Sequence, residues 1–436
     1  MSVVIPSLRA VVSPAGWVRN ALWRSARAVP SLDLRFADNK SLVDATTGQS
    51  LVTFTRASTG TFVGSDGLIQ TATTNEPRFD HNPTTGESLG LLVEEARTNL
   101  LLRSEEFDNA YWIKSNLTVT SNSTTAPSGT TTADTLVEDT LLGIKAVQSA
   151  AITVASGQAY TFSCYAKPAG RNFAMFLMIG SFPATILAAF DLTNGTVGTT
   201  GGSPITTATN VGNGWYRLSI TATSSSAGVT VAQVRPCETS GTSFYQGNGT
   251  SGIHVWGAQL EAGAFATSYI PTTTAAATRA ADVVSITGSA FSSWYRQDEG
   301  TVFARYSFPQ SPNTGGARVF VFSNSAATNI IWLRAQGGVN RIYDVTDASV
   351  SQATFNQGAY AAGVEYRAAL ATKANDFGFA ENGGAPQSDS SGTMPSVDRL
   401  GIGVDASGAA PGNVHIRRLV FWPQRLPNPT LQSLTQ

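Results

Sequence analysis

Over most of the chain, apolar and polar residues alternate in short runs that end at glycine, proline, asparagine or serine. The runs at residues 160–165 (YTFSCY) and 215–220 (WYRLSI) show the alternation clearly. Successive side chains of a β-strand point to opposite faces, so a period of two predicts strands with one buried face. We therefore expect an all-β fold, built from many short strands that are joined by turns.

The strand pattern falls into two blocks, which we expect to form two tandem β-sandwich (jelly-roll) domains, residues 99–277 and residues 278–436. Turn signals separate the strands at short intervals in both blocks, as in sandwiches and jelly rolls. No fixed-period repeat is present. Further strands are expected at 144–154, 228–235 and 253–260, and then at 301–308, 317–323, 329–335, 340–345, 364–372, 376–380, 399–404 and 414–422, before a short terminal helix at Asn428.

The longest run without a charged residue lies between Arg171 and Asp191 and is just long enough to be considered as a membrane span. Gly180 and Pro183 interrupt its middle, so we expect two buried strands joined by a turn. Prolines also interrupt the N-terminus, which lacks the continuous apolar run of a signal peptide. We expect no membrane span.

Residues 31–98 are expected to form a β-rich connector, because they alternate in short strands and carry too few apolar residues for a large core. The runs 61–63 and 68–70 flank Gly64-Ser65-Asp66-Gly67, which predicts a hairpin.

Residues 13–29 have a helical pattern within an N-terminal docking segment, residues 1–30. Ser13 suits the N-cap, and Pro14 and Pro30 bound the helix. At 100° per residue, one side carries Trp17, Val18, Ala21, Leu22, Ser25 and Val29, and the other carries Arg19, Asn20, Trp23, Arg24 and Arg27. Such a basic amphipathic helix can pack on its own domain, dock on another protein or lie on a membrane surface. The candidate docking residues are Trp17, Arg19, Leu22, Arg24 and Arg27.

Composition narrows the function classes. Of the 436 residues, 42% are hydrophobic and 13% are charged, against roughly 25% charged in an average domain. The net charge is −1, so nucleic acid is not expected as a partner, since it requires a basic surface. Two cysteines, Cys164 and Cys237, exclude a disulfide scaffold but leave one bridge open.

Catalytic motifs are weak. Residues 86–90 (GESLG) fit a nucleophile elbow and residues 247–252 (GNGTSG) fit a dinucleotide loop, but each leads into an expected strand instead of a helix. Paired carboxylates on one strand face, which sandwich glycosidases use, are missing, and Glu365, Asp376 and Glu381 are expected to be solvated. We expect no enzymatic activity, no cofactor and no metal site, although a loop-bound calcium ion leaves no spacing signal.

Aromatic residues are the remaining candidates for ligand contact, because sugars stack on aromatic faces. Tyr165 and Trp215 lie opposite the apolar sets of their strands, whereas the faces of Trp256 and Trp332 are ambiguous. The candidate carbohydrate-binding residues are Tyr165, Trp215, Trp256 and Trp332. The alternative is that each tryptophan belongs to a sandwich core or closes its end.

Residues 55–112 resemble a module common in bacteriophage and prophage fibre, spike and tail proteins. The turn Gly64–Gly67 and the segments 76–80 (EPRFD) and 90–99 (GLLVEEARTN) carry the resemblance. It implies that a jelly roll similar to carbohydrate-binding modules follows and ends at 254–261 (HVWGAQLE) and 267–272 (TSYIPT). The last domain resembles a concanavalin-A-like or laminin-G-like sandwich, in segments 400–403 (LGIG), 416–419 (IRRL) and 425–426 (RL).

The resemblance implies a virion structural protein, a fibre or spike on the head, neck or tail of a bacteriophage. Other virion proteins would hold its N-terminus, and the sandwiches would face outward for adhesion to a host surface glycan. Many such proteins are trimers. Two alternatives stay open: a depolymerase of host surface polysaccharide, and a purely structural collar or decoration protein. Deleting residues 1–30 is expected to leave folded sandwiches and to abolish incorporation into particles.

Overall fold

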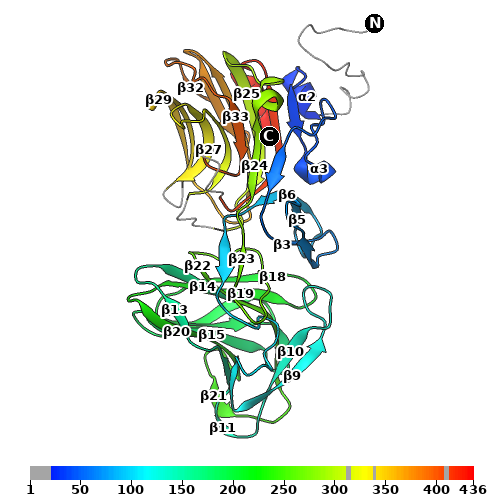
Figure 1. Cartoon of the computed structure of the whole chain (residues 1–436), viewed down its shortest axis with the longest axis vertical. Helices are drawn as coiled ribbons and strands as arrows, with labels where there is room; N and C mark the ends of the chain where they lie inside the picture. Colours follow the sequence, from blue (N-terminus) through cyan, green and yellow to red (C-terminus); the bar gives the residue numbers. More distant parts are fainter. Residues whose placement is uncertain (1–20, 311–315, 337–339, 407–411) are drawn as a thin grey trace.

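The computed structural model describes residues 21–310, 316–336, 340–406 and 412–436. Two β-sandwiches lie end to end along the long axis (Figure 1). All pairings between the named strands are antiparallel, and the helices are short. The all-β fold class is confirmed. No helix among these residues has the length and apolar character needed to cross a membrane.

The jelly roll occupies the lower half of Figure 1 and has two facing sheets. One sheet has the order β18 (Ile205–Asn210), β19 (Tyr216–Thr223), β14 (Ala159–Ala169), β22 (Gly252–Ala262), β10 (Ala133–Glu138) and β9 (Leu117–Thr124). The other has the order β17 (Thr196–Gly201), β16 (Ile186–Asp191), β15 (Phe173–Gly180), β20 (Gly228–Cys237), β12 (Ala146–Gln148) and β8 (Ile113–Ser115), with β13 (Ile152–Val154) also on β20. A ribbon of β11 (Leu142–Ile144) and β21 (Phe244–Gln246) forms the distal tip.

Alternation along these strands produces the jelly-roll core. Phe162 and Cys164 of β14 and Leu218 and Ile220 of β19 are fully buried between the two sheets. The uncharged run between Arg171 and Asp191 forms β15 and β16, which pair with each other, as predicted.

The C-terminal sandwich occupies the upper half of Figure 1. Its first sheet has the order β32 (Gln387–Asp389), β31 (Phe377–Glu381), β30 (Glu365–Lys373), β25 (Glu299–Ser307), β34 (Val414–Trp422), β6 (Ser88–Val93) and β5 (Arg78–His81), and β1 (Leu32–Leu34) also pairs with β34. Its second sheet has the order β2 (Thr53–Thr55), β24 (Val283–Thr287), β33 (Arg399–Ile402), β26 (Arg318–Ser323), β27 (Ile330–Gln336), β28 (Asn340–Asp347) and β29 (Val350–Ala359).

Residues 31–98 do not form the separate connector that we expected. Strands β1 and β6 pair with β34, and β2 pairs with β24, so these residues complete both sheets of the C-terminal sandwich. Their apolar side chains, including Leu34, Leu91 and Val93, enter its core. The segment looked too polar for its own core because it contributes to a core shared with residues 283–436. The jelly roll is thus inserted within the C-terminal sandwich.

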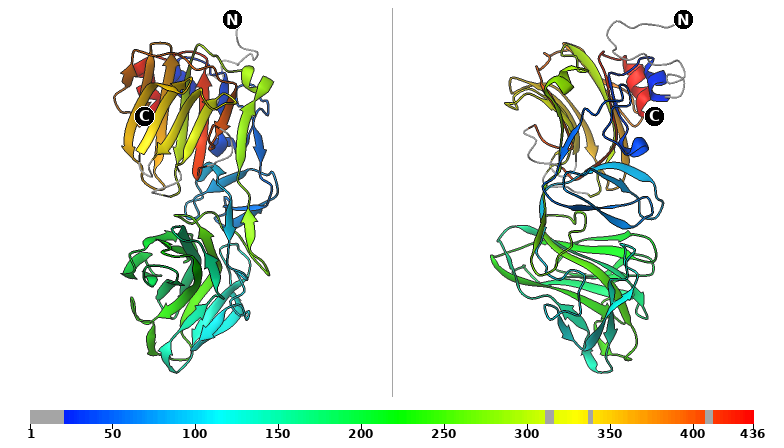
Figure 2. Two further views of the ribbon diagram at one scale, coloured as in Figure 1. Left: turned by 60° about the vertical axis from the view of Figure 1, so that its left-hand side comes forward. Right: turned by 45° about the vertical axis from the view of Figure 1, so that its right-hand side comes forward.

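Short elements complete the fold. The predicted hairpin is present as β3 (Gly60–Val63) and β4 (Ile69–Ala72). Helices α3 (Phe36–Asn39) and α4 (Gly288–Ser292) lie in connections, and α5 (Asn428–Thr435) confirms the expected terminal helix. Helix α2 (Ala21–Ala26) packs beside α5 on the outer face of the first sheet, at the end far from the jelly roll (Figure 2).

Candidate functional site

A two-stranded neck connects the two sandwiches. The chain leaves the C-terminal sandwich through β7 (Arg97–Asn99) and returns through β23 (Ala277–Arg279), and these two strands pair with each other. Beside the neck lies a cluster of buried charged side chains, which we call the neck cluster: Arg56, Arg78, Glu94, Arg279 and Asp282. It fastens both crossing segments to the C-terminal sandwich.

The neck cluster is held by direct ion pairs. Arg78 Nη1 lies 2.6 Å from Glu94 Oε2, and its Nη2 pairs with Asp282. Arg56 Nη1 lies 3.1 Å from the other oxygen of Asp282. Arg279 Nη1 lies 3.3 Å from Glu94. Each carboxylate therefore joins two guanidinium groups.

These ion pairs keep the carboxylates of the cluster ionised although they are buried. Burial alone would raise the pKa of Glu94, but Arg279, Arg78 and hydrogen bonds from Ser268 hold it well below the usual range. Burial would lower the pKa of Arg78, but Asp282 and Glu94 raise it overall. Glu94 thus stays ionised. Arg78 and Glu94 lie in the segments 76–80 and 90–99, so these segments help to position the two domains here.

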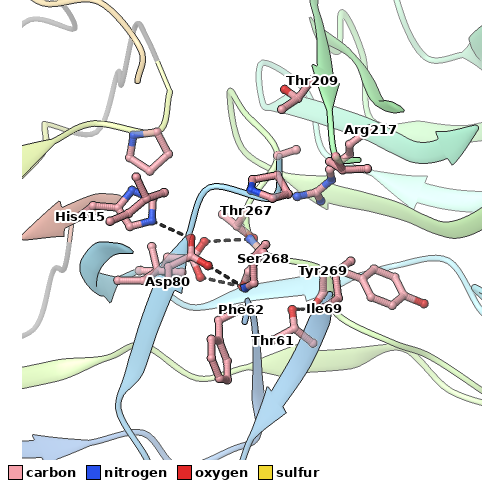
Figure 3. Close-up of a pocket in the computed structure, with 18 of the residues that line it drawn as sticks. Thr61, Phe62, Ile69, Asp80, Thr209, Arg217, Thr267, Ser268, Tyr269 and His415 are labelled. Carbon is pink, nitrogen blue, oxygen red and sulfur yellow. Dashed lines mark hydrogen bonds and ion pairs between the residues drawn. The ribbon is translucent and has the colours of Figure 1, made fainter. Parts of the chain in front are cut away.

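A cavity of about 220 Å³ lies next to the neck cluster, between the two sandwiches (Figure 3). Its wall includes Asp80 and His81 of β5, Thr209 and Arg217 of the jelly roll, the segment 266–269, His415 of β34, and Asn413, which directly precedes β34. Segments distant in sequence therefore meet here. We regard this interdomain cavity as the candidate functional site.

Fixed polar groups line one side of the interdomain cavity. The Asp80 carboxylate accepts hydrogen bonds from the Val63 N–H at 2.6 Å and from His415 Nε2 at 2.7 Å. His81 Nδ1 lies 3.0 Å from the Val63 carbonyl oxygen. Among the described residues, His81 Nε2 and Asn413 Oδ1 are buried without a hydrogen-bond partner. Buried polar atoms normally have partners, so a polar occupant suits this cavity.

Arg217 lies on the opposite wall, and Figure 3 shows its side chain directed from β19 toward Thr267 and Ser268. Its guanidinium carbon lies 5.4 Å from the centre of the Tyr165 ring. Its Nη2 donates a 3.2 Å hydrogen bond to Ser163 Oγ. Sequence reasoning missed Arg217: the alternation of β19 assigns it to the outer face, but the lack of a carboxylate partner is a property of the assembled fold.

Three of the four predicted carbohydrate-contacting aromatics are buried. Tyr165 is 4% exposed, Trp215 1% and Trp256 2%. They point away from the jelly-roll core, as expected for Tyr165 and Trp215, but they pack with Tyr269 and Ala126 in a cluster that the β3–β4 hairpin covers through Ile69. Of these three residues, Tyr165 lines the interdomain cavity. Their burial agrees with the alternative interpretation, in which these aromatic residues pack in the protein interior instead of contacting a sugar.

Trp332 is half-buried on the outer face of the second sheet of the C-terminal sandwich. Its indole N–H donates a 3.1 Å hydrogen bond to Asp344, and the guanidinium of Arg334 lies 4.4 Å from the ring centre. Arg334 also pairs with Asp344 at 2.8 Å. This ring is far from the other three aromatics in the fold, and one of its faces is covered by Arg334.

The docking residues predicted on the N-terminal helix fall into two groups, those outside and those within the described part of the chain. Trp17 and Arg19 lie outside the described residues. Arg24 of α2 and Arg27, directly after α2, are exposed, and Leu22 of α2 is half-buried against the C-terminal sandwich. Trp23, which we placed on the polar side, is 4% exposed and donates a 3.0 Å hydrogen bond to Asp33. The described part of the helix packs on its own domain, and the polar tip of the indole explains why Trp23 appears at a polar position.

Other candidate groups are engaged in structure. Cys164 and Cys237 are free and buried, and burial raises the pKa of both thiols to about 12. Glu365, Asp376 and Glu381 are not simply solvated as expected: Glu365 pairs with Arg305, Asp376 with Arg425 and Glu381 with Arg341. In the part of the chain that the structure describes, no three His, Cys, Asp or Glu side chains gather as metal ligands would.

No protein-family model and no curated protein sequence matches this chain. Solved structures with a similar arrangement include the CBM40 module of Ruminococcus gnavus IT-sialidase bound to alpha2,3 sialyllactose, at 15% identity over 32% of this chain and 83% of that chain, with a TM-score of 0.28. The K499G mutant of NanB sialidase from Streptococcus pneumoniae is 14% identical over 34% of this chain and 26% of that chain, with a TM-score of 0.29. The receptor-binding domain of botulinum neurotoxin mosaic serotype C/D is 11% identical over 35% of this chain and 39% of that chain, with a TM-score of 0.28. A similarity at this level says nothing about the ligand of this chain.

Proposed function

We propose that this protein is a structural component of a bacteriophage particle, a fibre or spike that adheres to a host surface glycan and has no catalytic activity. In this proposal it forms a homotrimer and joins other virion proteins through residues 1–30. Exposed Arg24 and Arg27, together with Trp17 and Arg19, supply the contacts. The protein then resides on the head, neck or tail of the particle.

The observation that carries the proposal is the neck. It holds the inserted jelly roll at the end of the molecule opposite α2 and α5 (Figure 2). Arg78 and Glu94, from the phage-like segments 76–80 and 90–99, belong to the neck cluster, which fits a rigid spacer between an attachment end and an outward end. The interdomain cavity adds a recess with polar groups in its wall, where a glycan terminus can enter.

Immunogold electron microscopy of purified particles tests the virion role. One antibody recognises the C-terminal sandwich, and a second recognises the distal ribbon of β11 and β21. We expect both labels at defined sites on the particle, with the second label farther from its axis. Protein that is present only in the lysate, with unlabelled particles, would overturn the virion role and favour a free depolymerase.

Binding of the full chain to purified host surface polysaccharide tests adhesion. We expect saturable binding and no release of reducing ends over hours. Release of reducing ends that a single carboxylate substitution abolishes would identify an enzyme instead. Absence of both binding and cleavage, with labelled particles, would leave a purely structural collar or decoration protein.

A further inference from the structure

Arg217 is an uncompensated charge in the wall of the interdomain cavity. It lies in register with Thr209 on β18 and with Tyr165 on β14, on the face opposite the jelly-roll core. Among the described residues, its guanidinium forms no ion pair with a carboxylate, its Nη2 bonds Ser163 Oγ, and its Nε is buried without a hydrogen-bond partner. A half-buried guanidinium without a counter-charge is unfavourable, so a bound anion would stabilise it.

Two acids line the cavity, Asp80 and Glu94, and neither forms an ion pair with Arg217 within 4 Å. Asp80 accepts hydrogen bonds from His415 and Val63. Glu94 joins Arg78 and Arg279 in the neck cluster. Lys167, two residues beyond Tyr165 on β14, has no carboxylate within 4 Å among the described residues and adds positive potential on the same face. The jelly-roll wall of the cavity therefore favours an anionic group.

The other free groups of the wall favour a hydroxylated ligand. The unpartnered Asn413 Oδ1 can accept a hydrogen bond from a hydroxyl, and Thr209 offers an exposed hydroxyl beside Arg217. The volume of about 220 Å³ is below the roughly 300–1,000 Å³ of pockets for drug-sized ligands. It suits one sugar residue at the end of a chain.

We propose that the interdomain cavity binds a carboxylate-bearing sugar residue, with the carboxylate on the guanidinium of Arg217 and the hydroxyls on Asn413 and Thr209. This inference rests on the proposed glycan-binding function and specifies its ligand class. A planar guanidinium suits this role because it can donate two parallel hydrogen bonds to one carboxylate.

Isothermal titration calorimetry of the full chain with galacturonic acid and with galactose tests the inference, because the two sugars differ in the carboxylate. We expect the acid to bind at least about tenfold more tightly, as a charged hydrogen bond does. Arg217→Gln should abolish this difference. Arg235→Gln is the matched control: Arg235 is also a partly buried jelly-roll arginine, bonded to Gln233 and outside the cavity wall, so the preference should remain.

A second variant keeps the test valid if Arg217→Gln fails to fold. Thr209→Glu changes an exposed residue and places a carboxylate beside Arg217, which should also abolish the preference for the acid. Equal affinity for the two sugars, no binding of either, or a preference that survives both variants would overturn the inference. If the variants bind host polysaccharide as the unmodified chain does, the proposed ligand class is wrong but the adhesion proposal is unaffected. If the unmodified chain binds no host polysaccharide, the adhesion proposal itself is wrong.

Discussion

At the scale of single residues, the neck cluster carries a large desolvation cost. Three arginines and two carboxylates are removed from water there, and burial of an ion is favourable only when partners surround it. Glu94 is central because it contacts Arg78, Arg279 and the Ser268 N–H and hydroxyl. Removing its charge leaves the three buried guanidinium groups of the cluster with one carboxylate, Asp282, which pairs with Arg56 and Arg78 but not with Arg279.

We predict that Glu94→Gln lowers the free energy of unfolding by about 3–5 kcal/mol, the loss expected when one partner of a buried ion pair is removed. Urea unfolding followed by tryptophan fluorescence measures it. The control is Asp298→Asn, which breaks a surface pair of Asp298, 67% exposed, with Arg296. That change should stay below about 1 kcal/mol. Equal effects of the two variants would contradict the role of the cluster.

The pH dependence of stability provides a second residue-scale prediction. Asp134 is buried in the jelly roll and accepts hydrogen bonds from the backbone N–H groups of Phe107 and Asn122. Burial raises its pKa to about 6, against the opposing effect of those N–H groups. Between about pH 4 and 6 the folded protein therefore binds a proton that the unfolded chain does not bind. Protonation of Asp134 therefore contributes its full stabilisation below about pH 4, and this contribution is lost as the pH rises through 6.

We expect the unfolding free energy to rise by about 2 kcal/mol from pH 7.5 to pH 4.5 through this group. Asp134→Asn should be less stable overall and should lack this rise. Urea unfolding at intervals of half a pH unit compares the two proteins. Glu94 acts in the opposite direction, because its depressed pKa makes stability fall as the pH drops below about 4.5. An identical slope in both proteins above pH 4.5 would contradict the assignment.

At the scale of elements, β6 shows how a local motif serves a distant partner. Residues 86–90 match a nucleophile elbow in sequence, but Ser88 lies in β6, which pairs with β5 and β34. Gly90 has φ +87°, and a Cβ there would collide with the backbone carbonyl of Ile416 on β34. Glycine at this position permits the close approach of the two strands.

We predict that Gly90→Ala destabilises the protein by about 2–5 kcal/mol, from backbone strain together with the collision. Gly48→Ala is the control, because Gly48 has φ +75° but open space around its Cβ position. Strain alone should cost about 1–2 kcal/mol there. Thermal unfolding by circular dichroism ranks the two variants. Equal shifts in Tm would show that contact with Ile416 is unimportant.

Most strands could be predicted from the sequence, because alternation and turn residues are local signals. The β3–β4 hairpin, the pair β15 and β16 and the terminal helix follow from such signals. Pairing partners could not be predicted in this way. Strand β1 pairs with β34, whose residues lie almost four hundred positions later, and no local pattern encodes that contact. The role of residues 31–98 was therefore misread.

At the scale of the whole molecule, insertion of one sandwich into the other creates the candidate site. Asp80, Arg217, Ser268 and His415 meet only because β7 and β23 return the chain to the point where it left. Sequence reasoning identified Tyr165 as a candidate, and Tyr165 lines the cavity, but aromatic stacking was the expected chemistry. A cavity between domains depends on how they are joined, which composition and spacing do not reveal.

The same architecture changes the test of N-terminal attachment. A deletion of residues 1–30 removes α2 along with the segment before it. Trp23 then no longer packs against the sandwich, and the Ala28 carbonyl no longer accepts the hydrogen bond from the indole N–H of Trp422. Loss of a buried tryptophan typically costs about 3–5 kcal/mol. A failure of that deletion variant to enter particles would therefore combine misfolding with lost docking.

We predict that a deletion of residues 1–20 separates the two effects. It retains each contact of α2 described above, so its Tm should match the full chain within a few degrees, whereas Trp23→Ala should lower the Tm clearly without removing Trp17 and Arg19. Particle incorporation, measured by immunoblot of purified particles, should be lost for the deletion and retained for Trp23→Ala at a permissive temperature. The opposite pattern would place the attachment surface on α2 and the sandwich beneath it.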